Sequence, residues 1–316
     1  MTPPVVTVFG GAGFVGRHVV RRLAKQGWII RVAGRDPERA KFLGPLGDVG
    51  QITPIAVALQ RPDSIAAAVA GADAVINLVG ILYERGRQNF KAVHVDGPKF
   101  IAEAAAAAGV KSLVHVSAIG ADTTAKSDYA RSKGYGEQVV RAAFPDAVIC
   151  RPSLVIGPED GFFNRFGMLA RLMPWLPLIG GGKTRFQPVY VGDLAEAISR
   201  VLTDPKARGA SFELGGPKVY TFKELMQLLL SQIHRRRLLI PVPFWVAELQ
   251  AAFLELMPVP LLTRDNVLLL KQDNVVSQGM PGFADLDITP TAIEVVIPSY
   301  LDRYRPGGRA SRLRAA

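Results

Sequence analysis

The chain has 316 residues, 49% hydrophobic and 21% charged, as in a folded globular protein that can hold one large α/β domain and a smaller lobe. Its single cysteine, Cys150, excludes an internal disulfide, and one cysteine with four scattered histidines predicts no metal site. The net charge of +11 indicates an acidic partner, such as an anionic lipid surface or an acidic protein. No nucleic-acid-binding motif accompanies the charge, so we expect no nucleic acid.

The first predicted elements are a strand, a glycine-rich turn and a helix. Residues 5–9 are apolar or β-branched, as in a buried parallel strand, and residues 17–26 have helical periodicity. Between them, three glycines stand at G-x-x-G-x-x-G spacing: Gly10, Gly13 and Gly16. The first permits a tight turn, the second lets the backbone approach a pyrophosphate, and the third lets helix and strand pack closely. The N-terminus of the predicted helix offers free N–H groups to the phosphates, and Phe14 and Val15 of the turn are further candidate cofactor contacts, so the segment predicts a dinucleotide site.

The end of the second predicted strand, at residues 28–33, selects the dinucleotide. NAD-binding proteins place an acidic residue there for the ribose 2′-hydroxyl. Here Gly34 stands at that place and Arg35 follows it, which supplies a forked cation for a 2′-phosphate. This chemistry favours NADPH over NADH. Asp36 leaves the alternative open, because a longer strand would make it the acidic residue that binds the ribose.

Strands and helices then alternate along the chain. Further strands are predicted at residues 51–59, 74–80, 110–117 and 147–150, and helices at residues 62–70, 89–108 and 127–144. Because these connections are too long for hairpins, the pattern predicts an α/β fold with a doubly wound parallel sheet, Rossmann-like in type. Gly80 ends one strand where the chain must pass close to a bound dinucleotide.

The composition changes after residue 152, where glycine and proline become frequent. We therefore expect a dinucleotide-binding core over residues 1–152 and a smaller, mixed C-terminal lobe over residues 153–316 that covers the cofactor. This lobe contributes late strands at residues 187–191 and 211–214 and ends in a basic tail with five arginines in residues 303–314. The first strand begins by Val5, so we expect no signal or transit peptide before it.

An apolar stretch at residues 238–257 follows the basic residues 234–237. Pro241 and Pro243 interrupt it, so it does not read as a transmembrane span. Two interpretations stay open. The stretch is a helix buried against its own lobe, or it lies on an anionic membrane surface.

Tyr129 and Lys133 are candidate catalytic residues. A spacing of four puts both on one face of the helix predicted at residues 127–144. A lysine there can bind the nicotinamide ribose and lower the tyrosine pKa, and the tyrosine can then move a proton to or from a substrate oxygen.

These features together resemble the extended short-chain dehydrogenase/reductase superfamily. The similar stretches are the glycine turn, residues 77–80, residues 116–118, the pair Tyr129 and Lys133, residues 151–153 and residues 189–193. The resemblance implies that the dinucleotide also contacts Leu78, Val79, Gly80, Ser117, Tyr129, Lys133, Pro152 and Ser153.

Within that superfamily the chain is most similar to the nucleotide-binding accessory subunits of respiratory complex I, the NADH:ubiquinone oxidoreductase. The stretches that carry this likeness are residues 45–51, 75–80, 136–141, 187–191 and 263–266. The resemblance implies an NADPH kept as a structural element on the peripheral arm, beside complex I subunits near the quinone site. It implies a cytoplasmic position at the inner face of a bacterial plasma membrane, or the matrix side of a mitochondrial one.

The sequence departs from active reductases at the third catalytic position. Those enzymes place a serine or threonine one or two residues after the position of Ser117, where this chain has Ala118 and Ile119. We therefore expect Ser117 to contact the cofactor rather than act in catalysis, and we expect an accessory role without turnover. The alternative is an NADPH-dependent reductase, epimerase or dehydratase of a small or nucleotide-linked metabolite, since Tyr129 and Lys133 are both present.

Overall fold

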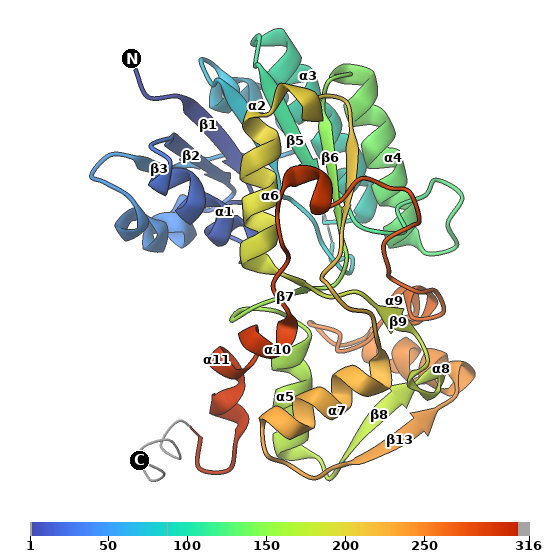
Figure 1. Cartoon of the computed structure of the whole chain (residues 1–316). Coiled ribbons are helices and arrows are strands. Elements are labelled where there is room, and N and C mark those ends of the chain that lie inside the picture. Colours follow the sequence, from blue (N-terminus) through green and yellow to red (C-terminus); the bar gives the residue numbers. More distant parts are fainter. Residues whose placement is uncertain (1, 87, 309–316) are drawn as a thin grey trace. The chain divides into compact units, whose positions relative to one another are not determined.

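The computed structural model describes residues 2–86 and 88–308 (Figure 1). The chain packs as two compact units. The first contains the chain as far as Pro152 together with Gly192–Leu214 and Gln278–Ile288, and the second contains Ser153–Val191, Gly215–Ser277 and the residues from Thr289. The division at residue 152 into a core and a covering lobe stays a prediction. Residues 309–316 of the predicted basic tail lie outside the described residues.

The first unit is built on a seven-stranded sheet in the order β11-β6-β5-β4-β1-β2-β3, with parallel pairing throughout. Its strands are β1 (Val5–Phe9), β2 (Ile29–Gly34), β3 (Ile52–Ala56), β4 (Ala74–Asn77), β5 (Ser112–Val116), β6 (Val148–Pro152) and β11 (Ser211–Leu214). The predicted doubly wound parallel sheet is therefore confirmed. The late strand at residues 211–214 pairs with β6 and forms an edge of this sheet.

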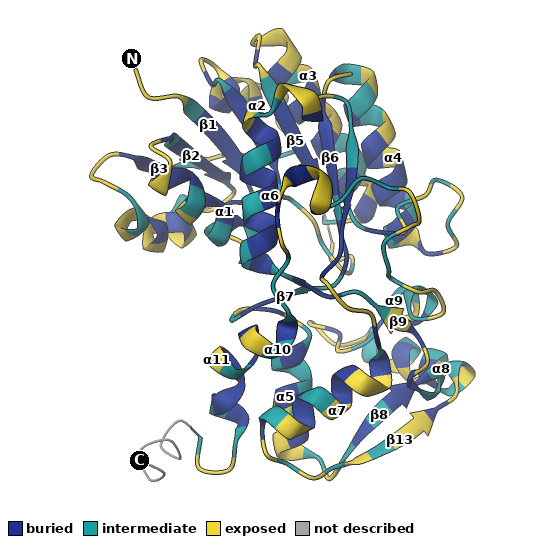
Figure 2. Ribbon diagram, viewed as in Figure 1, coloured by how far each residue is buried: buried dark blue, intermediate teal, exposed yellow. Residues whose placement is uncertain are grey.

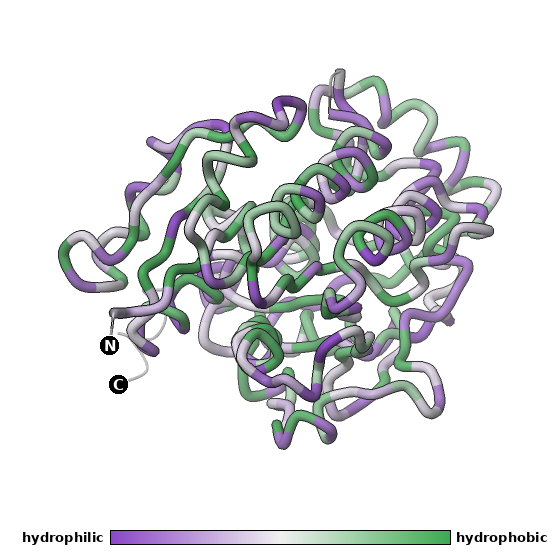
Figure 3. Tube along the Cα trace, turned by 90° about the horizontal axis from the view of Figure 1, so that it is seen from above, coloured by the Kyte–Doolittle hydropathy of each residue, from purple (hydrophilic) through white to green (hydrophobic). Residues whose placement is uncertain are grey.

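Helices cover both faces of the sheet, and the strands between them are largely buried (Figures 1 and 2). One face carries α2 (Pro62–Val69), α3 (Gly97–Ala107) and α4 (Asp128–Ala143), and the other carries α1 (Phe14–Lys25) and α6 (Val191–Thr203). Phe9 of β1 shares an apolar cluster with Ile65 and Ile101 of the first group. On the other face, Arg22 of α1 pairs with Glu196 of α6 at 2.7 Å. Figure 3 shows hydrophilic and hydrophobic residues interspersed along the helical coils of the chain, as the one-sided burial of helices requires.

The helix predicted at residues 89–108 is interrupted. A π-helical turn covers Lys91–Asp96, and regular α3 begins only at Gly97. The N–H of Gly97 donates to the carbonyl of Ala92, five residues back. Pro98 has no N–H to give to the carbonyl of His94, four residues before it, so a regular helical bond is impossible there.

The second unit is smaller and mixed, as predicted. Its strands pair as β7 (Val155–Ile156) with β10 (Val189–Tyr190), β8 (Trp175–Ile179) with β13 (Leu238–Val242), and β9 (Arg185–Phe186) with β12 (Tyr220–Thr221), the last pair antiparallel. Its helices are α5 (Phe163–Leu172), α7 (Phe222–Gln232), α8 (Phe244–Leu254), α9 (Arg264–Leu269), α10 (Ile293–Val296) and α11 (Pro298–Leu301). Its core includes the fully buried side chains of Phe163, Phe222 and Leu225. Among the described residues, none of the helices combines the length and apolarity needed to cross a bilayer.

Candidate dinucleotide-binding site

The predicted cofactor residues of the first unit gather at the carboxyl ends of neighbouring strands. Gly10 follows β1, Arg35 follows β2, Leu78 follows β4 and Ser117 follows β5, while Pro152 ends β6. The strand order reverses between β1 and β4, and doubly wound sheets bind their ligands outside the carboxyl ends at such a point. The sheet therefore brings together residues that are far apart in the sequence.

The glycine turn between β1 and α1 is a tight turn built from backbone. Gly10 has a φ of 80°, and its carbonyl accepts from the N–H of Gly13 at 3.0 Å. A Cβ atom on Gly16 would overlap the carbonyl oxygen of Gly10, so the helix can approach the strand only with glycine there. Gly13 is the N-cap of α1, and among the residues that the structure describes no side-chain hydrogen bond caps the helix. The N–H groups of its first turn are thus left for a phosphate.

The loop after β4 packs against this turn. A Cβ on Gly10 would lie 3.2 Å from the carbonyl carbon of Leu78. The Asn77 side chain shapes the loop, because its Oδ1 accepts from the N–H of Val79 at 3.1 Å. A Cβ on Gly80, in turn, would lie 3.3 Å from Nζ of Lys133. A side chain at either glycine would crowd the neighbouring segment, so these segments approach one another through backbone atoms.

Ser117 is only 4% exposed, and its buried hydroxyl has no hydrogen-bond partner among the described residues. Leaving a buried hydroxyl unpaired costs stability. A ligand group at the carboxyl end of β5 would satisfy this hydroxyl, which fits a bound dinucleotide. The next two residues, Ala118 and Ile119, provide no hydroxyl for catalysis.

Tyr129 and Lys133 both lie on α4, beside the loop after β4. The Tyr129 ring meets the His94 ring edge to face, with centroids 5.4 Å apart. Lys133 is 4% exposed, and its Nζ donates to the carbonyl of Val116 at 3.2 Å. The ammonium group therefore lies at the end of β5, within the same site.

A buried ionic network lies beneath this end of the site, and sequence analysis missed it. Burial lowers the pKa of Lys133 to about 8, and the carboxylate of Glu137 opposes that shift. Glu137 accepts two bonds from Arg151, at 2.9 and 2.5 Å, and Arg151 also lies 3.7 Å from Glu213. These residues come from α4, β6 and β11, so no spacing in the sequence signals their contact.

Two of the four scattered histidines also meet at this site. Nδ1 of His115 lies 3.1 Å from the side-chain amide of Asn77, and Nδ1 of His94 lies 2.8 Å from the hydroxyl of Ser132. Burial lowers the pKa of His94 to about 2 and that of His115 to about 3, and the nearby charge of Lys133 adds to both shifts. Both rings are therefore neutral at physiological pH.

Arg35 is exposed after β2, where its guanidinium lies against the side-chain amide of Gln88. β2 ends at Gly34, so the longer strand that would make Asp36 a ribose ligand is not formed. Asp36 instead caps the following 3-10 helix, accepting from the N–H of Glu38 at 3.1 Å, and pairs with Arg39 at 3.6 Å.

Ser153, the last predicted cofactor residue, belongs to the second unit. Its hydroxyl contacts the backbone and side-chain oxygens of Asn274 at 2.9 and 2.7 Å, within that unit. Its contact with a dinucleotide therefore stays a prediction.

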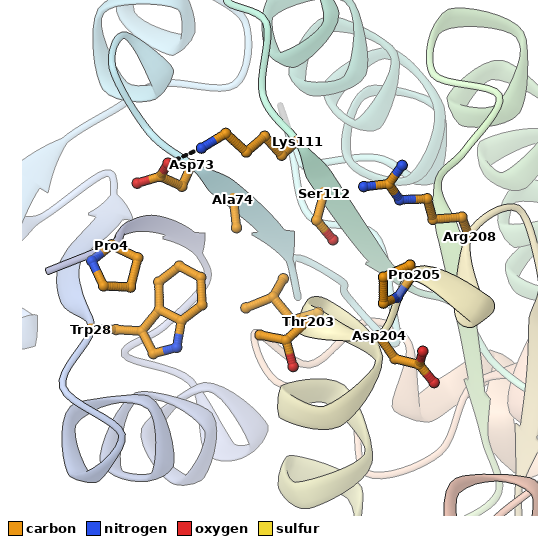
Figure 4. A pocket seen from close by; sticks show the side chains of 11 residues that line it. Pro4, Trp28, Asp73, Ala74, Lys111, Ser112, Thr203, Asp204, Pro205 and Arg208 are labelled. Atoms are coloured by element: carbon orange, nitrogen blue, oxygen red, sulfur yellow. Dashed lines mark hydrogen bonds and ion pairs between the residues drawn. The ribbon is translucent and has the colours of Figure 1, made fainter. Parts of the chain in front are cut away.

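A cavity of about 290 Å³ opens at the amino ends of the strands, opposite the predicted cofactor residues (Figure 4). Pro4, Trp28, Asp73 and Lys111 line it, each just before a strand. Asp73 is satisfied by Lys111 at 2.8 Å and by the N–H of Val5 at 2.9 Å. This ion pair stabilises the starts of the strands, and the cavity lies away from the predicted phosphate-binding turn.

The lowered pKa of Lys133 predicts a pH-dependent stability. Up to about pH 8 the lysine is protonated in both states, whereas between about pH 8 and its unfolded value of 10.5 only the unfolded chain keeps the proton. The free energy of unfolding should therefore rise with pH in this window, by up to about 3 kcal/mol relative to Lys133→Met. Urea unfolding of nucleotide-free protein near pH 7.5 and pH 10 measures this, with the exposed Lys25→Met as the control. A wild-type advantage that stays constant across the window would contradict it.

Comparisons with known proteins agree with this geometry. The model of the "NAD dependent epimerase/dehydratase family" matches residues 6–215. The Arabidopsis thaliana protein named "NADH dehydrogenase [ubiquinone] 1 alpha subcomplex subunit 9, mitochondrial" is 37% identical, over 96% of this chain and 79% of its own length. The Mus musculus protein of the same name is 36% identical, over 95% of this chain and 80% of its own.

Among solved structures, dTDP-glucose 4,6-dehydratase from Bacillus anthracis in complex with NAD has a TM-score of 0.73. The two sequences are 16% identical, and the alignment covers 95% of this chain and 96% of the dehydratase. This similarity shows a common fold. The family match and the relatives above 30% identity support one assignment. The chain belongs to the NAD dependent epimerase/dehydratase family, within the group that includes these NADH dehydrogenase subunits.

Proposed function

We propose that this chain is an accessory subunit of respiratory complex I that holds a dinucleotide as part of its structure. The observation that carries the proposal is the 37% identity to the Arabidopsis NADH dehydrogenase subunit over 96% of the chain. That range extends beyond the dinucleotide-binding family match, which ends at residue 215. The similarity therefore includes most of the second unit. A shared dinucleotide site in the first unit would not by itself explain similar sequences in the second.

NADPH is the dinucleotide that the residues after β2 favour. Gly34 carries no carboxylate that would repel a 2′-phosphate, and the Asp36 carboxylate is engaged as a helix cap. Arg35 is exposed beside them, and its planar guanidinium suits a phosphate. The same features make NADH, whose 2′-hydroxyl calls for an acidic partner, the weaker ligand.

A holding role without turnover follows from the hydroxyl groups at the end of β5. Tyr129 and Lys133 lie four residues apart on α4, the spacing that a reductase uses, but Ala118 and Ile119 cannot polarise a substrate carbonyl. The buried hydroxyl of Ser117 is suited to contact the nucleotide instead. Lys133 then serves to bind the ribose rather than to activate a tyrosine.

Replacing Arg35 by aspartate should weaken NADPH binding by about 1.5–3 kcal/mol, because a charge-assisted phosphate contact becomes a repulsion. Isothermal titration of nucleotide-free protein with NADPH and NADH measures this, and the loss should be much smaller for NADH. Lys25→Asp, at the far end of α1, makes the same charge change and should bind like wild type. Equal NADPH affinity in both variants would remove Arg35 from the site.

We also propose that the second unit faces an anionic membrane surface. Trp245 and Phe253 of α8 are 69% and 68% exposed, and Leu238 of β13 is 71% exposed. Arginines precede β13 in the chain, and burial together with the charges of Arg237 and Arg171 lowers the pKa of Arg235. Exposed apolar side chains in a unit that also carries clustered cations fit the headgroup region of an acidic bilayer.

One experiment with two arms tests both partners. The tagged full chain, recovered from its native membranes in mild detergent, should bring core complex I subunits with it, and its recovery as a free protein would contradict the accessory role.

In the second arm, the double variant Arg171→Gln/Arg236→Gln should bind phosphatidylserine vesicles about ten- to thirtyfold more weakly than wild type at low salt. Lys25→Gln/Arg61→Gln is the charge-matched control. Equal vesicle binding by the two double variants would exclude Arg171 and Arg236 as membrane contacts.

A further inference from the structure

His94 connects two elements of the dinucleotide site although it lies outside the motifs that define that site. It is 1% exposed and lies in the π-helical turn Lys91–Asp96. Its ring stacks on Phe90 with centroids 5.3 Å apart. Its backbone carbonyl packs so close to Gly136 of α4 that a Cβ atom on Gly136 would overlap it. The first contact holds the ring and the second holds the backbone that carries it, and π-helical turns are frequent at functional sites.

The hydrogen bonds of His94 determine its tautomer. Nε2 accepts from the N–H of Ile81 at 3.0 Å, so this nitrogen carries no proton. The Ser132 hydroxyl donates to the carbonyl of Tyr129 at 2.8 Å, so it must accept from Nδ1 of His94, also at 2.8 Å. The ring is therefore a neutral bridge with its proton on Nδ1.

This bridge joins the loop after β4 to helix α4. Ile81 follows Gly80, and a Cβ on Gly80 would lie 3.3 Å from Nζ of Lys133 and 3.7 Å from Nε2 of His94. The bond to Ile81 thus holds the backbone of Gly80 against the Lys133 ammonium. A shift of this loop would move the backbone that Lys133 and a bound ribose have to share.

We propose that His94 is a positioning residue of the dinucleotide site, acting through the N–H of Ile81 to hold the loop after β4 against Lys133. The inference depends on the proposed function, because it concerns how the nicotinamide-ribose half of the nucleotide is held. The adenosine half would lie at the glycine turn and Arg35, and within the described part of the chain His94 makes its hydrogen bonds and ring contacts elsewhere. His94 should therefore affect binding of the whole dinucleotide and not of its adenosine end.

Two substitutions separate the two bonds. His94→Gln places an amide oxygen near the position of Nε2 and can still accept from Ile81, whereas His94→Asn places an amide near Nδ1 and reaches only Ser132. Titration of the nucleotide-free full chain should give NADPH affinity within about twofold of wild type for His94→Gln. For His94→Asn it should be about three- to tenfold weaker, the value of one lost hydrogen bond. Adenosine 2′,5′-bisphosphate, which lacks the nicotinamide half, should bind all three proteins equally.

The same NADPH affinity in all three proteins would overturn the inference while leaving the proposed function intact. A wild-type protein that binds neither NADPH nor the bisphosphate would overturn the proposed function and this inference with it. Nitrogen NMR of the wild-type imidazole needs no variant to fold, and it should show Nδ1 protonated and Nε2 unprotonated through the neutral pH range. The opposite tautomer would exclude the bond to Ile81 and contradict the inference.

Discussion

The site depends on how closely three backbone segments approach one another at the point where the strand order reverses. The carbonyl of Gly10 occupies the space that any side chain on Gly16 would need, and Leu78 packs against Gly10 from the loop after β4. Only glycine allows this approach, and with glycine also at the N-cap position no side-chain hydrogen bond from the described residues caps the first turn of α1. The predicted phosphate-binding turn is therefore a consequence of how the sheet and its first helix pack.

Beneath the other end of the site, buried charge sets what the residues can do. Lys133 keeps its pKa near 8 because Glu137 opposes the effect of burial, and Glu137 is itself held by Arg151. The neighbouring histidines are neutral and engaged in hydrogen bonds. The Lys133 ammonium lies at the end of β5 and is suited to bind a ribose. This arrangement, with Ala118 after Ser117, favours binding of a nucleotide without catalytic turnover of a substrate.

Local sequence predicted the parallel sheet, the glycine turn and the helix that carries Tyr129 and Lys133, because each depends on residues within one turn or one strand. It did not predict the interruption of the helix at Lys91–Asp96, although Pro98 was a signal for it. The His94 bridge and the contact of Glu137 with Arg151 were not predictable, because their partners lie far apart in the chain and meet only in the fold. The choice of NADPH is a prediction from Gly34 and Arg35 alone.

The central claim is that this chain holds a phosphorylated dinucleotide. The most direct measurement is to denature the protein as purified from its native membranes, separate the released small molecules and identify them by mass spectrometry. The account predicts NADPH or NADP⁺ in about one-to-one proportion to the chain. Release of NAD⁺ or NADH in that proportion would contradict the role of Arg35, and release of no nucleotide would contradict the account itself.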